Sequence, residues 1–160
     1  MPLPQLWTVD QALSQDRLPG QLPVEAALTR AFLLEHGAAY HWIATNVRLG
    51  VGDDPGPAYP DYARRYAVAT TQKRADLVGF RDKTVDIFEV KVQANLSEIG
   101  QLIGYKTLWN REFPATPADL LGVIARHMSL DTMTVLLAQG MPLFLYPDVL
   151  LPDLTIVRPS

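Results

Sequence analysis

The chain has 160 residues, of which 48% are hydrophobic and 19% charged, with a formal net charge of −3. These values are typical of one globular domain that buries its own core, so residues 1–160 are interpreted as a single domain. The sequence has no cysteine, which excludes disulfides and thiolate metal sites and leaves oxygen or histidine as metal ligands. No apolar run approaches the roughly 20 residues that span a bilayer, and no signal peptide is recognised, so a cytoplasmic protein without membrane contact is expected.

Charge is unevenly distributed along the chain. Residues 62–111 contain nine Lys or Arg against five Asp or Glu, a balance of +4, whereas the remainder of the chain carries −7. A basic face of this kind suits contact with phosphate groups, although a solvated charged surface would give the same count.

The N-terminal part predicts an arm, a helix and a strand. Residues 1–20 are rich in proline and lack periodicity, which indicates an extended arm with one helical turn near Val9–Ser14. Residues 22–37 have a proline, Pro23, in their first turn, continue with Ala, Leu and Phe and end at a glycine, as a helix does. Residues 39–49 alternate apolar with polar side chains and predict the first strand.

Residues 50–72 predict a loop or flap inserted into the domain, because glycine and proline recur through their first half. A helical turn or an edge strand is expected near the end of this segment. It mixes cations with aromatic rings, a combination that suits unpaired bases and phosphates. An ordinary surface loop with packed tyrosines is the alternative. The residues concerned are Tyr59, Tyr62, Arg64, Arg65 and Tyr66.

Two short apolar runs, Ala75–Phe80 and Thr84–Val92, flank a polar turn and predict a β-hairpin. An amphipathic helix is expected to follow at about Ser97–Trp109. After a proline-containing linker, the remaining elements expected are strands at Leu120–Arg126 and Pro142–Tyr146, a helix at Leu130–Gln139 between them, and a short edge strand at Leu154–Val157.

Charged side chains interrupt the hairpin in a pattern that suggests chemistry. Glu89 and Lys91 fall on one face of the second strand because side chains alternate, and Asp76 lies on the partner strand. Burying these groups is costly without a purpose, although a cross-strand salt bridge would explain Glu89 and Lys91 more simply. Two carboxylates and a backbone carbonyl can hold a hard cation such as Mg²⁺, and a nearby lysine can act on water or phosphate.

The motif Asp76, twelve residues, then Glu89-Val90-Lys91 resembles the centre of the PD-(D/E)xK nuclease superfamily. Gln101 and Tyr105, four residues apart on the expected helix, resemble the Gln-x-x-x-Tyr motif of its RecB-type exonuclease branch. Ala75 stands where the family name has proline. The predicted element order also matches the fold that the resemblance implies: α/β, with a restriction-endonuclease-like αβββαβ core, a mixed central sheet flanked by helices, and a C-terminal αβ extension.

The resemblance implies a role for each residue of the motif. Asp76, Glu89 and the Val90 carbonyl would hold Mg²⁺ or Mn²⁺, with Glu25 binding directly or through water. Glu25 could equally be a first-turn acid that stabilises its helix, and Glu35 is its competitor. Lys91 would orient water or stabilise charge on the phosphate. Gln101 and Tyr105 would position the assembly.

The function expected is metal-dependent hydrolysis of DNA phosphodiester bonds, by an exonuclease or by an endonuclease acting on single strands, flaps or ends. A catalytically inactive nuclease-fold module that binds nucleic acid or protein is the alternative. Homo-oligomers or a protein partner are compatible with either function, and small members of the superfamily are frequent in phages and mobile elements. The candidate nucleic-acid contacts are Arg64, Arg65, Lys73, Arg74 and Lys106.

Overall fold

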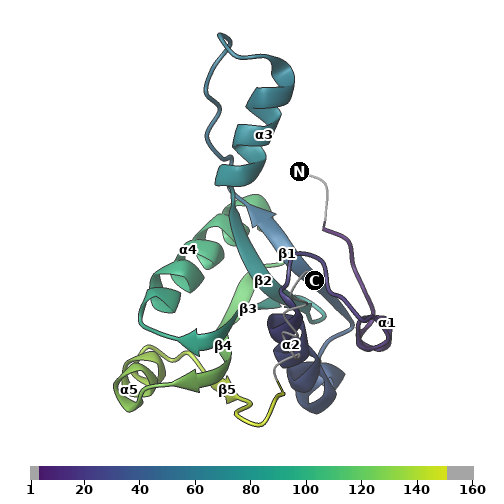
Figure 1. The fold of residues 1–160 in the computed structure, drawn as a ribbon, viewed down its shortest axis with the longest axis vertical. Helices are drawn as coiled ribbons and strands as arrows, with labels where there is room; N and C mark the ends of the chain where they lie inside the picture. Colours follow the sequence, from purple (N-terminus) through teal and green to yellow (C-terminus); the bar gives the residue numbers. More distant parts are fainter. Residues whose placement is uncertain (1–3, 151–160) are drawn as a thin grey trace, which may run out of the picture.

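A five-stranded mixed sheet forms the centre of the computed structural model, which describes residues 4–150 (Figure 1). The strands lie side by side in chain order, β1 to β5. The first three are antiparallel neighbours, whereas β4 is parallel to β3 and β5 is parallel to β4. The strands are β1 Trp42–Leu49, β2 Lys73–Phe80, β3 Val85–Ala94, β4 Ala118–Met128 and β5 Leu143–Leu145.

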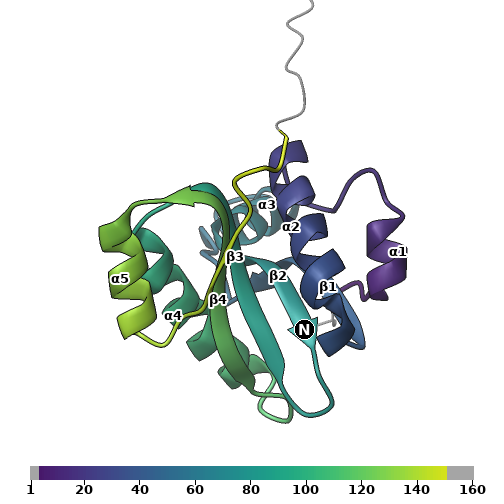
Figure 2. The same cartoon turned by 90° about the horizontal axis from the view of Figure 1, so that it is seen from below.

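Helices cover both faces of the sheet (Figure 2). α1 and α2 pack on one face, and α4 and α5 pack on the other. The predicted αβββαβ order, mixed sheet and αβ extension are confirmed. The helices are α1 Val9–Leu13, α2 Pro23–His36, α3 Asp61–Thr71, α4 Ser97–Glu112 and α5 Leu130–Ala138, with a 3₁₀ turn at Gly37–Ala39.

Local signals in the sequence set several helix ends. Thr8 and Gln11 form a reciprocal capping box at α1, and the Ser129 hydroxyl accepts from the Thr132 amide at the start of α5. Pro23 occupies the first turn of α2, where its missing N–H would have had no partner. The short strand predicted at 154–157 lies outside the described residues.

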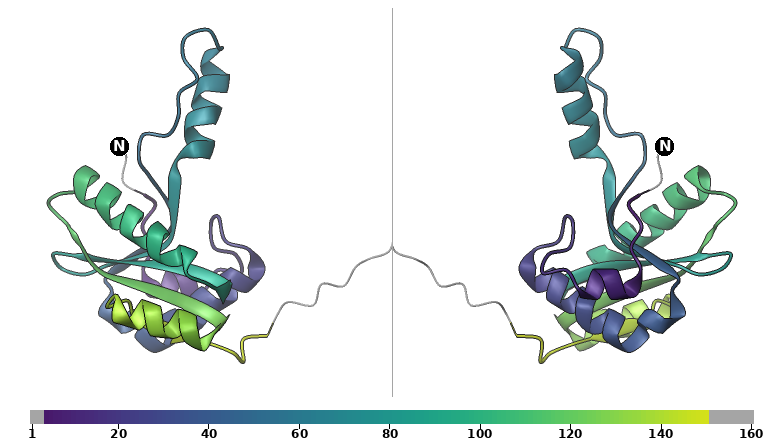
Figure 3. Two further views of the ribbon diagram at one scale, coloured as in Figure 1. Left: turned by 90° about the vertical axis from the view of Figure 1, so that its left-hand side faces the viewer. Right: turned by 90° about the vertical axis from the view of Figure 1, so that its right-hand side faces the viewer.

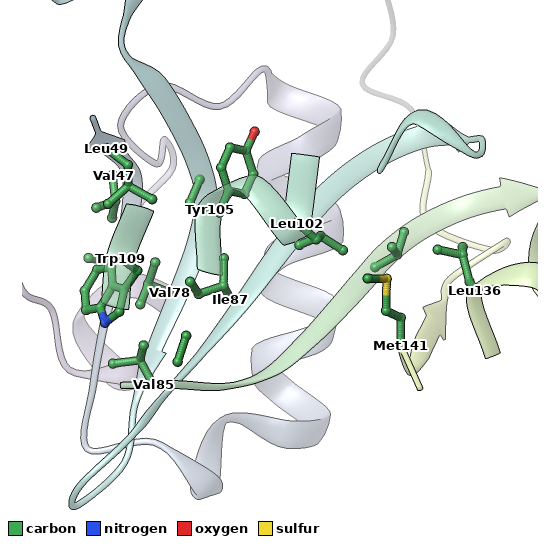
Figure 4. Close-up of a cluster of buried hydrophobic side chains, with 14 of the residues drawn as sticks. Val47, Leu49, Val78, Val85, Ile87, Leu102, Tyr105, Trp109, Leu136 and Met141 are labelled. Atoms are coloured by element: carbon green, nitrogen blue, oxygen red, sulfur yellow. The ribbon is translucent and has the colours of Figure 1, made fainter. Parts of the chain in front are cut away.

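The core divides into two clusters, one on each face of the sheet. The cluster beneath α4 includes Trp109 and Leu102, which are almost fully buried against β2 and β3 (Figure 4). The cluster beneath α2 includes Phe32 and Phe88. Burying such large apolar side chains is the main source of stability, so β3, buried on both faces, is held firmly in place.

The segment 50–72 differs from the loop that its composition predicts, because its second half is an 11-residue helix, α3. Figures 1 and 3 show α3 and the preceding loop projecting from the end of the β1–β2 hairpin, away from the other helices. α3 has no buried residue. Its alanines and first-turn Asp61 favour helix locally, which compensates for the missing tertiary packing. From here on, the arm means residues 51–72 and not the N-terminal segment 1–20.

Candidate functional site

The β2–β3 ladder ends beside the predicted carboxylates. The last register pair is Leu77 with Phe88, so Asp76 and Glu89 occupy the next positions, where the strands no longer pair. The Val90 backbone amide donates to Asp76 Oδ2 at 2.8 Å. A side chain therefore takes the place of a ladder bond beside the two carboxylates.

The β1–β2 ladder is also irregular beside Asp76. Thr45 pairs with Leu77 and Val47 with Ala75, but Asn46, opposite Asp76, has a φ of 53° and interrupts the pattern. A positive φ at a residue other than glycine is uncommon and concentrates at turns and functional sites. At Asp76, therefore, the pairing of β2 is irregular with both of its neighbours, β1 and β3.

Side chains near the start of α2 hold the backbone of Asp76. The Gln21 amide donates to the Asp76 carbonyl oxygen at 3.1 Å, and the Thr29 hydroxyl donates to Gln21 Oε1 at 2.9 Å. Sequence reasoning missed both residues, since neither belongs to a motif and their pairing depends on a contact 55 residues away along the chain.

Glu89 and Lys91 form the ion pair expected of a Glu-x-Lys strand. The Lys91 Nζ lies 2.9 Å from Glu89 Oε1, and the Glu89 side chain is 2% exposed. The second oxygen, Glu89 Oε2, is buried and has no partner at hydrogen-bond distance and angle within residues 4–150, although the Tyr105 hydroxyl acts on this carboxylate and lowers its pKa. An unpaired buried carboxylate oxygen is costly, so this atom marks a position where a ligand would be stabilising.

Burial makes the two carboxylates hard to ionise. It raises the pKa of Asp76 to about 7, with a further contribution from the Glu89 charge, while the Val90 amide and Lys91 oppose the shift. Burial also raises the pKa of Glu89, against the opposing effect of Lys91. For Lys91 burial acts the other way, but Glu89 outweighs it and the pKa of the ammonium is raised. Lys91 therefore stays a cation at neutral pH.

Glu25, the acid carried over from the family, lies near this group. Its Oε2 accepts from the Leu22 backbone amide at 2.9 Å, which closes the first turn of α2. Its charge still contributes to the raised pKa of Asp76 and of Lys91, so it lies within electrostatic range of both groups. The competitor Glu35 instead accepts from the Tyr146 hydroxyl at 2.9 Å.

Tyr105 and Gln101 occupy different parts of α4. The Tyr105 ring is packed in the core cluster, with its hydroxyl pointing out of it (Figure 4). Burial and the charges of Glu89 and Asp76 raise the pKa of that hydroxyl, so it stays protonated and can donate. Gln101 is exposed and lines a cleft of about 650 Å³ together with Tyr105 and Lys73.

A buried acid outside the motif also affects the site. Glu98, in the first turn of α4, is 2% exposed and accepts from the Asn95 amide and the Ser97 hydroxyl. Its charge contributes to the raised pKa of Glu89. It fixes the turn that connects the Lys91 strand to the Gln101 helix. A first-turn acid is the sequence signal that could have indicated it.

The residues predicted to contact nucleic acid differ in whether their charged groups already donate hydrogen bonds within the protein. Arg64 forms a two-pronged pair with Asp54, at 2.9 and 2.6 Å, and so stabilises the arm itself. The Arg74 guanidinium donates to the Ala69 carbonyl at 3.2 Å and Lys106 to the Asp119 carbonyl at 3.4 Å. Arg65 and Lys73 are exposed.

The donors present fit a hard divalent cation. No group of three or more His, Asp or Glu side chains gathers with metal-binding geometry within residues 4–150. Two carboxylates, one with an unpartnered buried oxygen, are nevertheless an all-oxygen set of the kind that Mg²⁺ uses when water and substrate phosphate complete its coordination. Glu25 then suits binding through water.

Comparisons with known proteins add a distant structural likeness. No protein-family model and no curated protein matches the chain. Among solved structures, a repair endonuclease from Pyrococcus abyssi is similar, with 11% identity and a TM-score of 0.41 over 75% of this chain. The match covers 46% of that chain, so the present chain spans about half of its length. Such a similarity is too distant to assign a function. Within residues 4–150, no helix is long and apolar enough to cross a membrane.

Proposed function

We propose that the chain is a metal-dependent nuclease that hydrolyses phosphodiester bonds of DNA. The observation that carries the proposal is Glu89 Oε2, which is buried and has no hydrogen-bond partner within residues 4–150. It lies beside Asp76 where the β2–β3 ladder stops, and the other oxygen of the same carboxylate pairs with Lys91. Glu112 Oε2 is likewise buried without a partner within residues 4–150, so the support comes from the place of Glu89 Oε2 beside Asp76 and Lys91.

Asp76, Glu89 and the Val90 carbonyl would hold Mg²⁺ or Mn²⁺, with Glu25 acting through water. Bound there, the cation would polarise the scissile phosphate and lower the pKa of an attacking water. Burial raises the pKa of Asp76 and of Glu89, and a cation bound between them would favour their charged forms.

The remaining residues supply donors around the phosphate. Lys91 remains charged because of Glu89, so its ammonium can orient water or stabilise negative charge that develops on the phosphate. The Tyr105 hydroxyl stays protonated and can donate to Glu89 or to a bound water. Gln101, exposed in the cleft, can donate or accept at the substrate.

The arm is proposed as a second contact with nucleic acid. Tyr62 and Tyr66 lie one helical turn apart and are 72% and 73% exposed. Exposed tyrosines beside the exposed guanidinium of Arg65 suit stacking on unpaired bases. Arg64 holds the loop against the helix through Asp54 and so keeps this surface in shape.

The proposal is tested by incubating labelled single-stranded, double-stranded and flapped DNA with the full chain in Mg²⁺, in Mn²⁺ and in EDTA. Cleavage that requires the metal and is lost in Lys91→Ala is expected. The matched control is Lys83→Ala, in the exposed hairpin turn. If no DNA is cleaved and calorimetry detects no metal binding, the alternative of an inactive nucleic-acid- or protein-binding module replaces it.

A further inference from the structure

The β1–β2 ladder lacks a residue pair at Asp76. The pairs on either side keep the same register, Thr45 with Leu77 and Val47 with Ala75, so neither strand contains an inserted residue. A β-bulge would have added a residue to one strand, whereas here the left-handed conformation of one residue, with a φ of 53°, interrupts the pairing. The gap therefore affects a single position of β2, and that position is Asp76.

The side chain of Gln21 provides a donor at this gap. Ile43 exchanges its backbone hydrogen bonds with Trp7 on the outer side of β1, so by alternation residue 46 is one that would bond to β2. The Asp76 carbonyl, which lies at that position, accepts from the Gln21 side-chain amide at 3.1 Å. A side chain from the segment before α2 thus bonds to Asp76 where the ladder lacks a pair.

A tight turn at residues 18–21 presents Gln21 to the sheet. The Gln21 amide donates to the Leu18 carbonyl at 3.2 Å, and the central residues are Pro19 and Gly20, the latter with a φ of 72°. Proline followed by a glycine of positive φ is typical of a type II turn. The Thr45 hydroxyl donates to the Pro19 carbonyl at 3.1 Å, which attaches the turn to β1.

The turn and β1 fit closely at Asn46. A Cβ added to Gly20 would lie 2.2 Å from Asn46 Cγ, so the approach of the turn to β1 requires glycine. Asparagine adopts a positive φ more readily than most residues. Behind the turn, the fully buried Thr29 donates to Gln21 Oε1 at 2.9 Å. Both ends of the Gln21 amide are therefore held, one by α2 and one by Asp76.

The gap at Asp76 explains how its carboxylate reaches a backbone amide of β3. In a regular strand the side chains stand perpendicular to the sheet, whereas backbone amides lie in its plane. The Asp76 carboxylate nevertheless accepts from the Val90 amide at 2.8 Å. A backbone paired regularly with both neighbouring strands would not allow this bond, so the orientation of the carboxylate depends on what holds the Asp76 backbone.

We propose that Gln21 is a positioning residue, which turns the Asp76 backbone so that its carboxylate bonds to the Val90 amide. Asn46 admits Gln21 by interrupting the ladder, and Thr29 orients it. The part of the inference that concerns a cation rests on the proposed nuclease function, in which Asp76 is a ligand. Loss of a partner that orients a metal ligand typically lowers metal affinity by about 10–100-fold.

Hydrogen exchange of the Val90 amide tests the positioning in the metal-free full chain, in EDTA. Gln21→Met removes the donor at similar volume, and Val90 is expected to exchange about tenfold faster relative to Phe88, in the same strand. A merely structural role would speed both amides equally, because both would exchange through global opening. If Gln21→Met does not fold, Thr29→Val replaces it with the same expectation, since Gln21 then loses the hydroxyl that orients it.

Asn46→Gly and Asn46→Ala form a matched pair of variants. Both lose the side chain, but only glycine keeps a positive φ at little cost, so alanine favours the extended backbone and the regular ladder pair. In calorimetric titration with Mn²⁺, Asn46→Ala and Gln21→Met are expected to raise the Kd about tenfold, and Asn46→Gly to stay within about threefold of the natural protein. The exchange ratio of Val90 to Phe88 should rank the variants in the same order.

An unchanged exchange ratio in Gln21→Met would overturn the inference, as would equal effects of alanine and glycine at position 46. The two readouts separate it from the nuclease proposal. If the natural protein binds no Mn²⁺ while the exchange ratios follow the predicted order, the metal site is wrong and the positioning of Asp76 stands. Mn²⁺ binding that is unaltered in both Gln21→Met and Asn46→Ala contradicts the positioning role alone.

Discussion

The Val90 backbone amide donates to Asp76 Oδ2 at 2.8 Å where the β2–β3 ladder stops. This bond fixes the orientation of the Asp76 carboxylate, yet burial still raises its pKa to about 7. When no cation is bound, ionising this buried carboxylate destabilises the folded state, because few positive groups offset its charge. Metal-free stability should therefore depend on this group.

Asp76→Asn is expected to stabilise the metal-free protein above neutral pH. The unfolded carboxyl loses its proton near pH 3.8 and the folded one near pH 7, so the folded state holds the proton more tightly. The stability of the natural protein is fully present below pH 3.8 and falls as pH rises through 7. Asparagine cannot ionise and avoids this loss, which is on the order of 4 kcal/mol.

Thermal unfolding in EDTA across this pH range measures the difference. The gain of Asp76→Asn should vanish in acid, and added Mg²⁺ should stabilise the natural protein but not the variant. Asp119→Asn, at an exposed position, is the control. A variant less stable than the natural protein at every pH would contradict an uncompensated Asp76.

Glu89 and Lys91 should be coupled in stability. Lys91→Met leaves Glu89 buried without its partner, and we expect a cost on the order of 2 kcal/mol in metal-free protein at neutral pH. Adding Glu89→Gln to Lys91→Met removes the unpaired buried charge and should restore most of the lost free energy of unfolding. Urea unfolding of both single variants and the double variant measures the coupling. If the effects of the two substitutions on the free energy of unfolding are strictly additive, Glu89 and Lys91 do not stabilise the fold as a pair.

Asp86 is predicted to stabilise the fold without taking part in the site. The Tyr40 hydroxyl, Arg81 Nε and the Leu120 amide donate to its fully buried carboxylate, at 2.9, 2.8 and 3.3 Å. Asp86→Ala leaves the buried Tyr40 hydroxyl and the Leu120 amide without their acceptor and should cost about 3 kcal/mol in urea unfolding. If the Asp86→Ala variant folds, Mg²⁺ should still raise its melting temperature as it does that of the natural protein. Loss of that shift without loss of stability would place Asp86 in the metal site.

Tyr62→Ala and Tyr66→Ala together should weaken single-strand binding by about tenfold, since stacking on each ring is lost. The melting temperature should stay unchanged because α3 has no buried residue. Anisotropy and thermal unfolding provide the two readouts. Leu34→Ala, an exposed apolar residue of α2 that lies outside the arm, is the control. Equal binding by the tyrosine variant would remove the arm from the interface.

The sequence by itself determined the elements that carry strong local signals. The apolar hairpin, with its Glu89 and Lys91 alternation, and the helix with Gln101 and Tyr105 lie where periodicity predicted them. Periodicity succeeds there because burial on fixed faces dictates which residues are apolar. The 50–72 segment was predicted less well. Glycine and proline in its first half suggested a loop, whereas the alanine-rich second half is a helix without a buried residue.

Only the tertiary structure decided which of the acids share a site. Asp76, Asp86 and Glu89 all belong to one hairpin, yet Asp86 is satisfied by Tyr40 and Arg81 while Glu89 keeps an unpartnered oxygen. Some of the deciding partners are distant along the chain, such as Tyr40 for Asp86 and Gln21 for the Asp76 carbonyl. A hydrogen bond depends on atoms brought within about 3 Å by the whole fold, and local sequence patterns do not carry that information.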